Sequence, residues 1–207
     1  MTRYRFFRKS EPTDEFKLFK LYQALLITFI EIVIASFVLT AIHEGGHMFF
    51  AALFGVPILG FFISFGLGGY TLLDQTVFYA LPDIGIFFIY IGGILFELLA
   101  AYAFTQIAYT IKDDTKIKKV IKSFLLTCCG MAGWSAIINS ISLWGVQYIT
   151  TPNIVIGMND MTALVILMGT RGNFGLFITA IVVQVVFITI GALFMFKMVR
   201  DIRTVFK

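Results

Sequence analysis

Long apolar stretches separated by short polar ones run through most of the chain. A membrane span needs about 20 mostly apolar residues, and four stretches are long enough: residues 21–54, 84–111, 123–147 and 174–199. The first has 34 residues and would be about 51 Å long as one helix, so it is expected to tilt, bend or protrude. The pattern predicts an all-α, polytopic membrane protein with about four transmembrane helices.

Two connections between these spans are unusually apolar for loops. Residues 56–83 include the glycine-rich stretch Ser64–Tyr70, and residues 148–173 include Thr151-Pro152-Asn153 and Gly157-Met158-Asn159-Asp160. Irregular backbone enters a bilayer only where it packs against protein or lines a wet cavity. Both connections are therefore predicted to dip into the membrane as short re-entrant segments.

The composition excludes a soluble globular fold. Hydrophobic residues make up 59% of the 207 residues and charged residues 14%, with a mean hydropathy of +0.92, against about 45–50% apolar and about 25% charged in soluble domains. Only residues 1–20 have an ordinary soluble composition, and no repeat or low-complexity linker marks a further boundary. We expect an N-terminal tail over residues 1–20 and a single membrane-embedded domain over residues 21–207.

Basic residues gather at three places along the chain and predict its orientation. Of the sixteen Lys and Arg residues, six precede Leu21, five lie in residues 112–122, four lie from Lys197 onward, and Arg171 is the remaining one. Because cytosolic loops carry the excess of Lys and Arg, both termini and the 112–122 loop are predicted to be cytosolic. This placement next to the spans accounts for the net charge of +4, and no nucleic-acid role is assigned.

The chain's two histidines stand four residues apart near the end of the first span, in His43-Glu44-Gly45-Gly46-His47. Residues i and i+4 share one helix face, so both imidazoles can bind one Zn²⁺ at about 2.0–2.1 Å. Zinc lowers the pKa of a bound water to about 7, and Glu44 can accept its proton without being a ligand. An ionisable group inside a bilayer costs about 2.5–3.5 kcal/mol on the insertion scale, which favours a metal site over a chance motif or packing histidines.

Gly45 and Gly46, within this motif, each cost about 1 kcal/mol of helix propensity relative to alanine. Their lack of side chains lets another backbone approach the metal-binding face closely. That backbone is either a packed helix or an extended substrate, and both alternatives stay open.

A catalytic zinc usually has three protein ligands, so two histidines leave one to be found. Neither cysteine is well placed, and the carboxylate candidates are Asp160, Glu97, Glu31, Asp74 and Asp83. Asp160 is favoured because it lies in an apolar stretch, follows Gly157 and precedes a predicted helix over residues 161–168. The alternative is that Asp160 serves as the N-cap of that helix.

These residues resemble the site-2 protease family, the M50-class intramembrane zinc metalloproteases. The segment from His43 to Val56 is similar to the family's zinc helix, and Phe62-Ile63-Ser64-Phe65-Gly66 is similar to the membrane-associated strand that follows it. The resemblance implies a short β-hairpin there, whose edge would pair with an unwound substrate, and makes Ser64 and Gly66 possible substrate contacts. Asn159-Asp160 falls where the family's late helix supplies an aspartate ligand, which places Asn159 beside the metal.

The sequence departs from the family's pattern at three points. In Gly93-Ile94-Leu95-Phe96-Glu97, Ile94 and Glu97 replace the usual proline and asparagine. Glu97 is therefore expected to contact the substrate, to tune the zinc-bound water from outside the ligand set, or to be a protonated packing carboxyl. A late Asn-x-x-Pro and Leu-Asp-Gly pattern is absent around Asp160. Family members also hold the zinc toward the cytosol, whereas the charge distribution places this site on the other side.

The expected function is that of an intramembrane zinc metalloprotease that hydrolyses peptide bonds of membrane-embedded or membrane-proximal substrates. In this hypothesis His43, His47 and Asp160 bind Zn²⁺ and Glu44 is the general base and acid. The partners are the lipid bilayer and a membrane protein or peptide substrate, and the sequence indicates no particular oligomeric state. The alternative is a non-proteolytic zinc-binding membrane regulator or assembly factor, although such a protein would not need Glu44.

Overall fold

The computed structural model describes residues 14–64, 68–112, 114–141, 153–157 and 160–205. This part of the chain is mostly helical, with the long helices α1 (Asp14–Leu53), α3 (Asp83–Thr110), α4 (Lys116–Ile141) and α6 (Phe174–Val205). Among the described residues, these are the four helices long and apolar enough to cross a membrane. The predicted number of candidate spans is therefore confirmed.

Three helix boundaries differ from the prediction by six or seven residues. Helix α1 begins at Asp14, inside the predicted tail, α4 begins at Lys116 rather than at residue 123, and α6 ends at Val205 rather than at residue 199. Lysine is a good helix former. A helix can therefore extend past the end of its apolar stretch into the neighbouring charged residues. The end of the third span, predicted at residue 147, lies outside the described residues.

The first connection folds into β1 (Ile58–Ser64), β2 (Gly68–Asp74) and the short helix α2 (Gln75–Ala80), and the second contains β3 (Asn153–Gly157) and α5 (Asp160–Thr170). The described strands form one antiparallel sheet in the order β1-β2-β3. The predicted hairpin is thus present, and it is joined by a strand about 80 residues later in the chain. This pairing brings the segment before α5 next to the hairpin.

Close approaches of glycines set the helix packing. A Cβ atom at Gly46 of α1 would lie 2.2 Å from the carbonyl oxygen of Gly92 in α3, and one at Gly133 of α4 would lie 2.4 Å from that of Gly191 in α6. Backbone therefore meets backbone at both crossings. At Gly46 the approaching backbone is a packed helix, whereas at Gly45 no atom lies within 4 Å of such a Cβ.

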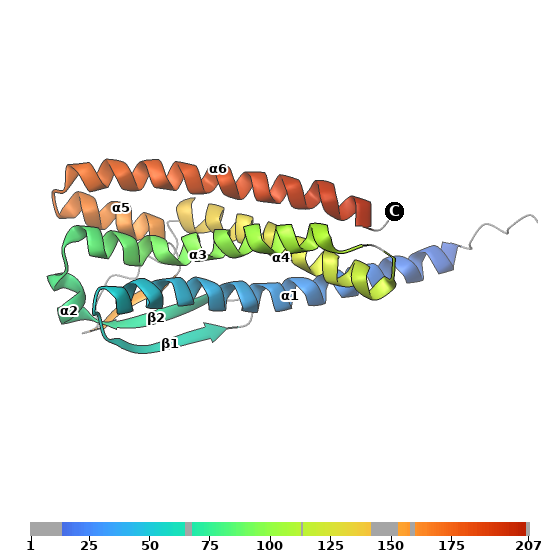
Figure 1. The fold of residues 1–207 in the computed structure, drawn as a ribbon, viewed down its shortest axis with the longest axis horizontal. Helices are drawn as coiled ribbons and strands as arrows, with labels where there is room; N and C mark the ends of the chain where they lie inside the picture. Colours follow the sequence, from blue (N-terminus) through green and yellow to red (C-terminus); the bar gives the residue numbers. More distant parts are fainter. Residues whose placement is uncertain (1–13, 65–67, 113, 142–152, 158–159, 206–207) are drawn as a thin grey trace, which may run out of the picture.

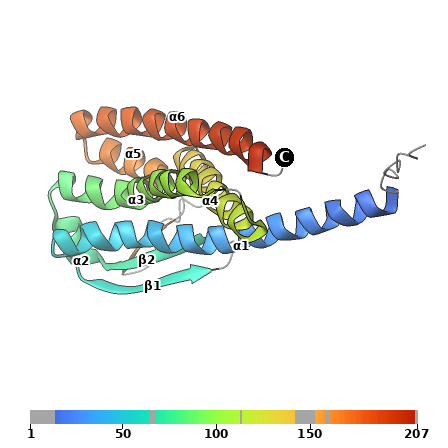
Figure 2. The same cartoon turned by 45° about the vertical axis from the view of Figure 1, so that its right-hand side comes forward.

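Helix α3 lies at the centre of the molecule, and many of its side chains are fully buried. The β1–β2 hairpin runs along α1 on the side away from α6 (Figure 1). The end of α1, the start of α3 and the α5–α6 link share one end of the molecule, while the α3–α4 link and the end of α6 share the other. The N-terminal part of α1 extends beyond the other helices, which the turned view also shows (Figure 2).

Candidate metal centre

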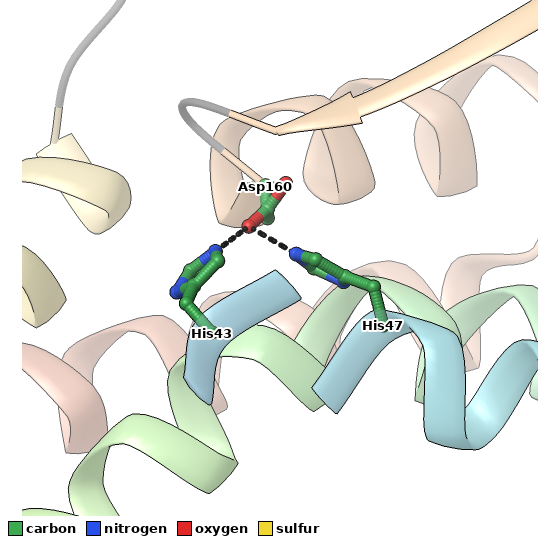
Figure 3. Close-up of side chains that lie close together, drawn as sticks. All are labelled: His43, His47 and Asp160. Atoms are coloured by element: carbon green, nitrogen blue, oxygen red, sulfur yellow. Dashed lines mark hydrogen bonds and ion pairs between the residues drawn. The ribbon is translucent and has the colours of Figure 1, made fainter. Parts of the chain in front are cut away.

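The histidine pair lies on the face of α1 that packs toward α3 and α5. His43 and His47 are both buried, and their ring centroids are 4.9 Å apart with the planes at 75°. The i, i+4 spacing in an unbroken helix places both rings on this one face. Their Nε2 atoms converge on Asp160 at the start of α5 (Figure 3).

Asp160 is the first residue of α5 and completes a group of three. Its Oδ2 atom lies 2.8 Å from Nε2 of His43 and 3.0 Å from Nε2 of His47, and the three residues form a buried group able to hold a metal ion. The other carboxylate oxygen, Oδ1, is buried without a hydrogen-bond partner. The side chain therefore points at the imidazoles and does not act as an N-cap.

The hydrogen bonding of His47 shows that this group fits a metal ion. Nδ1 of His47 lies 2.7 Å from the carbonyl oxygen of Ile89, and because a carbonyl only accepts, Nδ1 carries the proton. In the neutral ring Nε2 then presents a lone pair to the carboxylate of Asp160, and a proton or a metal ion between these two acceptors would satisfy both. Two imidazole nitrogens and a carboxylate oxygen are ligands that zinc prefers, and a ring held at its other nitrogen is typical of metal-binding histidines.

The spacing of the donor atoms is close to that of a zinc site. Ligand atoms around a tetrahedral zinc lie about 3.3 Å apart, given bonds of about 2.0–2.1 Å. The two distances from Asp160 Oδ2, 2.8 and 3.0 Å, are shorter by a few tenths of an ångström. All three ligand atoms lie within 4.8 Å of one another.

Glu44 is almost fully buried, and its carboxylate is hydrogen-bonded to β2 and not to the three clustered residues. Its Oε2 atom accepts a hydrogen bond of 2.7 Å from Oγ1 of Thr71 on β2. Glu44 and His43 line a pocket of about 240 Å³ between α1, the start of β2, α3 and α4. Glu44 and His43 therefore both border a space beside the three clustered side chains.

The remaining carboxylate candidates for the third ligand have other partners. Glu97 lies 3.1 Å from Nδ1 of His43, on the side of the ring away from Asp160. Glu31 accepts hydrogen bonds from Ser123 and Thr127, Asp74 caps α2 at the backbone N–H of Val77, and Asp83 binds Arg171 and Asn173. Asp160 is therefore the carboxylate that the fold brings to both imidazole Nε2 atoms.

The other predicted site residues lie at or beyond the edge of the described chain. The backbone of Ser64 ends β1 and pairs with Gly68. Gly66 and Asn159 lie outside the described residues.

Sequence reasoning missed Thr71 and the position of Gly93. A Cβ atom at Gly93 would lie 2.5 Å from Nε2 of both histidines, so α3 passes directly beside the clustered donor atoms. No local sequence pattern pointed to Thr71. The structure places it on the same face of β2 as Gly69, which approaches Glu44 closely, because residues i and i+2 of a strand share a face.

Comparison of the chain with family models, with curated proteins and with solved structures finds no match. The assignment of a function therefore depends on the arrangement of these side chains alone.

Proposed function

We propose that this protein is an intramembrane zinc metalloprotease of the site-2 protease type, which hydrolyses peptide bonds of membrane-embedded or membrane-proximal substrates. The observation that carries the proposal is the division of roles among the buried side chains. His43, His47 and Asp160 converge on one point, while Glu44, next to His43 in sequence, lines the adjoining pocket. A site that only stores metal would not need this second carboxylate.

His43, His47 and Asp160 would hold the Zn²⁺ ion. When bound, zinc supplies a Lewis acid that polarises a carbonyl and acidifies water. Glu44 would accept a proton from the attacking water while the oxygen of that water bonds to the scissile carbonyl carbon. The same carboxylic acid would then deliver that proton to the amide nitrogen as the C–N bond breaks, releasing the amine.

The hydrogen bond from Thr71 would orient Glu44 for this transfer. It fixes one carboxylate oxygen against β2, so the side chain need not be ordered when the substrate arrives. The surrounding protein, with Glu44 and His43 buried at 1% and 7% exposure, excludes bulk water from the reacting groups.

The substrate would bind as an extended segment against β1. Among the described strands β1 pairs only with β2. Its side chains Leu59, Phe61 and Phe62 are 50–59% exposed. An unpaired strand edge can form main-chain hydrogen bonds with an unwound peptide. Gly68 and Gly69, at the start of β2, line the pocket beside Glu44 and pair with the end of β1. A peptide paired with the end of β1 would therefore lie next to the part of the hairpin that borders the pocket.

The test uses the full-length protein reconstituted in liposomes with a panel of single-span substrates. Wild type, Glu44→Gln, His43→Ala and Glu31→Gln are compared for zinc content and for cleavage. Glu31 is the matched control because it is a buried glutamate of the same helix that lies outside the metal centre. Sequencing of new N-termini in native membranes, with wild type against Glu44→Gln, extends the test beyond the panel.

We expect one zinc per chain in wild type, Glu44→Gln and Glu31→Gln, and none in His43→Ala. Cleavage should fall by at least about 10² to 10⁴ in Glu44→Gln, the usual contribution of general acid–base catalysis, and persist in Glu31→Gln. Equal cleavage by wild type and Glu44→Gln would contradict the proposal. Zinc-loaded wild type that produces no Glu44-dependent N-termini would instead support the non-proteolytic zinc-binding regulator.

A further inference from the structure

Glu97 holds the nitrogen of His43 that faces away from the metal position. Its carboxylate is 2% exposed, and Oε2 lies 3.1 Å from Nδ1 of His43. Nε2 of the same ring lies 2.8 Å from Asp160. Glu97 is thus on the opposite side of the imidazole from the clustered donor atoms, where it cannot be a ligand in place of Asp160.

A hydrogen-bond chain from α4 holds Glu97 in turn. Oγ of Ser135 donates to the same Oε2 atom at 2.8 Å, and Nδ2 of Asn139, one turn further along α4, donates to Oγ of Ser135 at 3.1 Å. The amide N–H of Asn139 only donates, so the hydroxyl proton of Ser135 is directed to Glu97. The chain therefore runs from α4 through α3 to α1 with Glu97 as the acceptor at its centre.

The direction of this chain defines the tautomer of His43. Because Oε2 of Glu97 accepts, Nδ1 of His43 carries the proton, and in the neutral ring Nε2 has its lone pair toward Asp160. His47 is oriented in the same sense by the carbonyl of Ile89. A carboxylate also makes the imidazole a stronger donor to a metal than a neutral carbonyl does.

We propose that Glu97 is a positioning residue of the metal centre: it fixes the Nδ1–H tautomer and the orientation of His43, with Ser135 and Asn139 holding it in place. This inference rests on the proposed zinc site and concerns its affinity for metal. Glu97 stands where the family that the chain resembles has an asparagine. The inference therefore gives a role to one of the residues that depart from the family's pattern. The contact needs the length of a glutamate, since the carboxylate reaches from α3 to the far side of a ring on α1.

The test measures metal binding, so it does not depend on a substrate. Wild type, Glu97→Gln, Glu97→Leu and Ser135→Ala are purified in detergent, and Zn²⁺ affinity is measured by competition with a chromophoric chelator. The visible absorption of the Co²⁺-loaded proteins reports the ligand geometry. Glu31→Gln is the matched control because Glu31 is also buried and also accepts hydrogen bonds from hydroxyl groups of α4, but away from the histidines.

We expect Glu97→Leu to weaken Zn²⁺ binding about 10- to 100-fold, the usual effect of removing a partner of a metal-binding histidine. Glu97→Gln keeps an acceptor oxygen without the charge and should show a smaller loss, as should Ser135→Ala, with both altering the Co²⁺ spectrum. Glu31→Gln should keep the wild-type affinity and spectrum, even if its melting temperature falls.

Two outcomes separate this inference from the proposed function. If wild type binds zinc tightly and the Glu97 variants bind it equally well with an unchanged Co²⁺ spectrum, the role of Glu97 is refuted and the protease proposal stands. If wild type binds no zinc, both are refuted. Should Glu97→Leu fail to fold, the affinity and spectrum of Glu97→Gln and Ser135→Ala decide the question.

Discussion

Gly93 lies against both imidazole Nε2 atoms, and a single methyl group there would compete with a metal ion. A Cβ at this residue would lie 2.5 Å from each of these atoms, while zinc needs the same space at about 2.0–2.1 Å from each. We therefore expect Gly93→Ala to abolish zinc binding, as measured by metal analysis of the purified protein.

The matched control for Gly93→Ala is Gly45→Ala, within the zinc-binding motif itself. A Cβ at Gly45 meets no atom within 4 Å, so this variant should keep its zinc. Replacing a helical glycine by alanine should also stabilise it by about 1 kcal/mol. Full zinc occupancy in Gly93→Ala would show that the ion binds elsewhere.

Thr71 is the residue that orients the proposed general base. Its hydroxyl donates to Oε2 of Glu44 at 2.7 Å, and the side chain is fully buried. Hydrogen bonds to charged groups contribute about 1.5–3 kcal/mol, so Thr71→Val should lower the cleavage rate about 10- to 100-fold while zinc content stays unchanged. Thr71→Ser keeps the hydroxyl donor and should retain most of the activity. Equal cleavage rates in Thr71→Val and Thr71→Ser would exclude a role of this hydroxyl in orienting Glu44.

At the scale of elements, the position of Asp160 depends on how α5 is anchored. The far end of α5 is tied to the start of α3, because Nη1 of Arg171 lies 2.7 Å from Oδ1 of Asp83 and Nη2 donates to the carbonyl of Tyr79 at 3.3 Å. Asn173 binds the other oxygen of Asp83 at 2.9 Å. Helix α5 is thus held at one end by this link while its first residue meets the histidines.

Arg171→Met tests this anchor, since it keeps the length of the side chain and removes the charge. The pair is one-quarter exposed, so we expect a loss of roughly 1 kcal/mol in stability and a severalfold weaker affinity for Zn²⁺. Lys118→Met removes the exposed pair with Asp114 and should change neither. Thermal unfolding and chelator competition measure the two effects, and wild-type values for Arg171→Met would show that α5 is held by packing alone.

At the scale of the whole molecule, charge and topology make one joint prediction. Four crossings would place both termini and the 112–122 loop on one side, and fifteen of the sixteen Lys and Arg residues belong to these three segments of the sequence. We expect tags at either end to resist an impermeant labelling reagent in intact cells and to react after lysis.

The orientation also sets the side on which the metal centre lies. His47 is six residues before the end of α1 at Leu53, or about 9 Å of helix, so the site is nearer the end of the molecule opposite the basic clusters. Labelling of a terminal tag without lysis would reverse the topology and place the centre nearer the cytosol, as in the family that the motif resembles.

The sequence by itself determined the candidate spans and the histidine pair, because both depend on local properties. Hydropathy over about 20 residues identifies a span wherever it lies in the fold. The i, i+4 relation of His43 and His47 follows from helix geometry alone. The hairpin was suggested by resemblance, and the structure shows that hairpin together with β3, which no pattern indicated.

Tertiary structure decided which distant groups meet this pair. Asp160 is 117 residues from His43, and Glu97 is 54 residues from it. The local sequence favoured Asp160 among five candidate carboxylates but did not exclude the other four. The choice depended on the close crossing of α1 and α3 at Gly46 and Gly92 and on the anchored path of α5. Such contacts depend on the packing of whole helices, to which residues far apart in the chain contribute, so no local pattern could specify them.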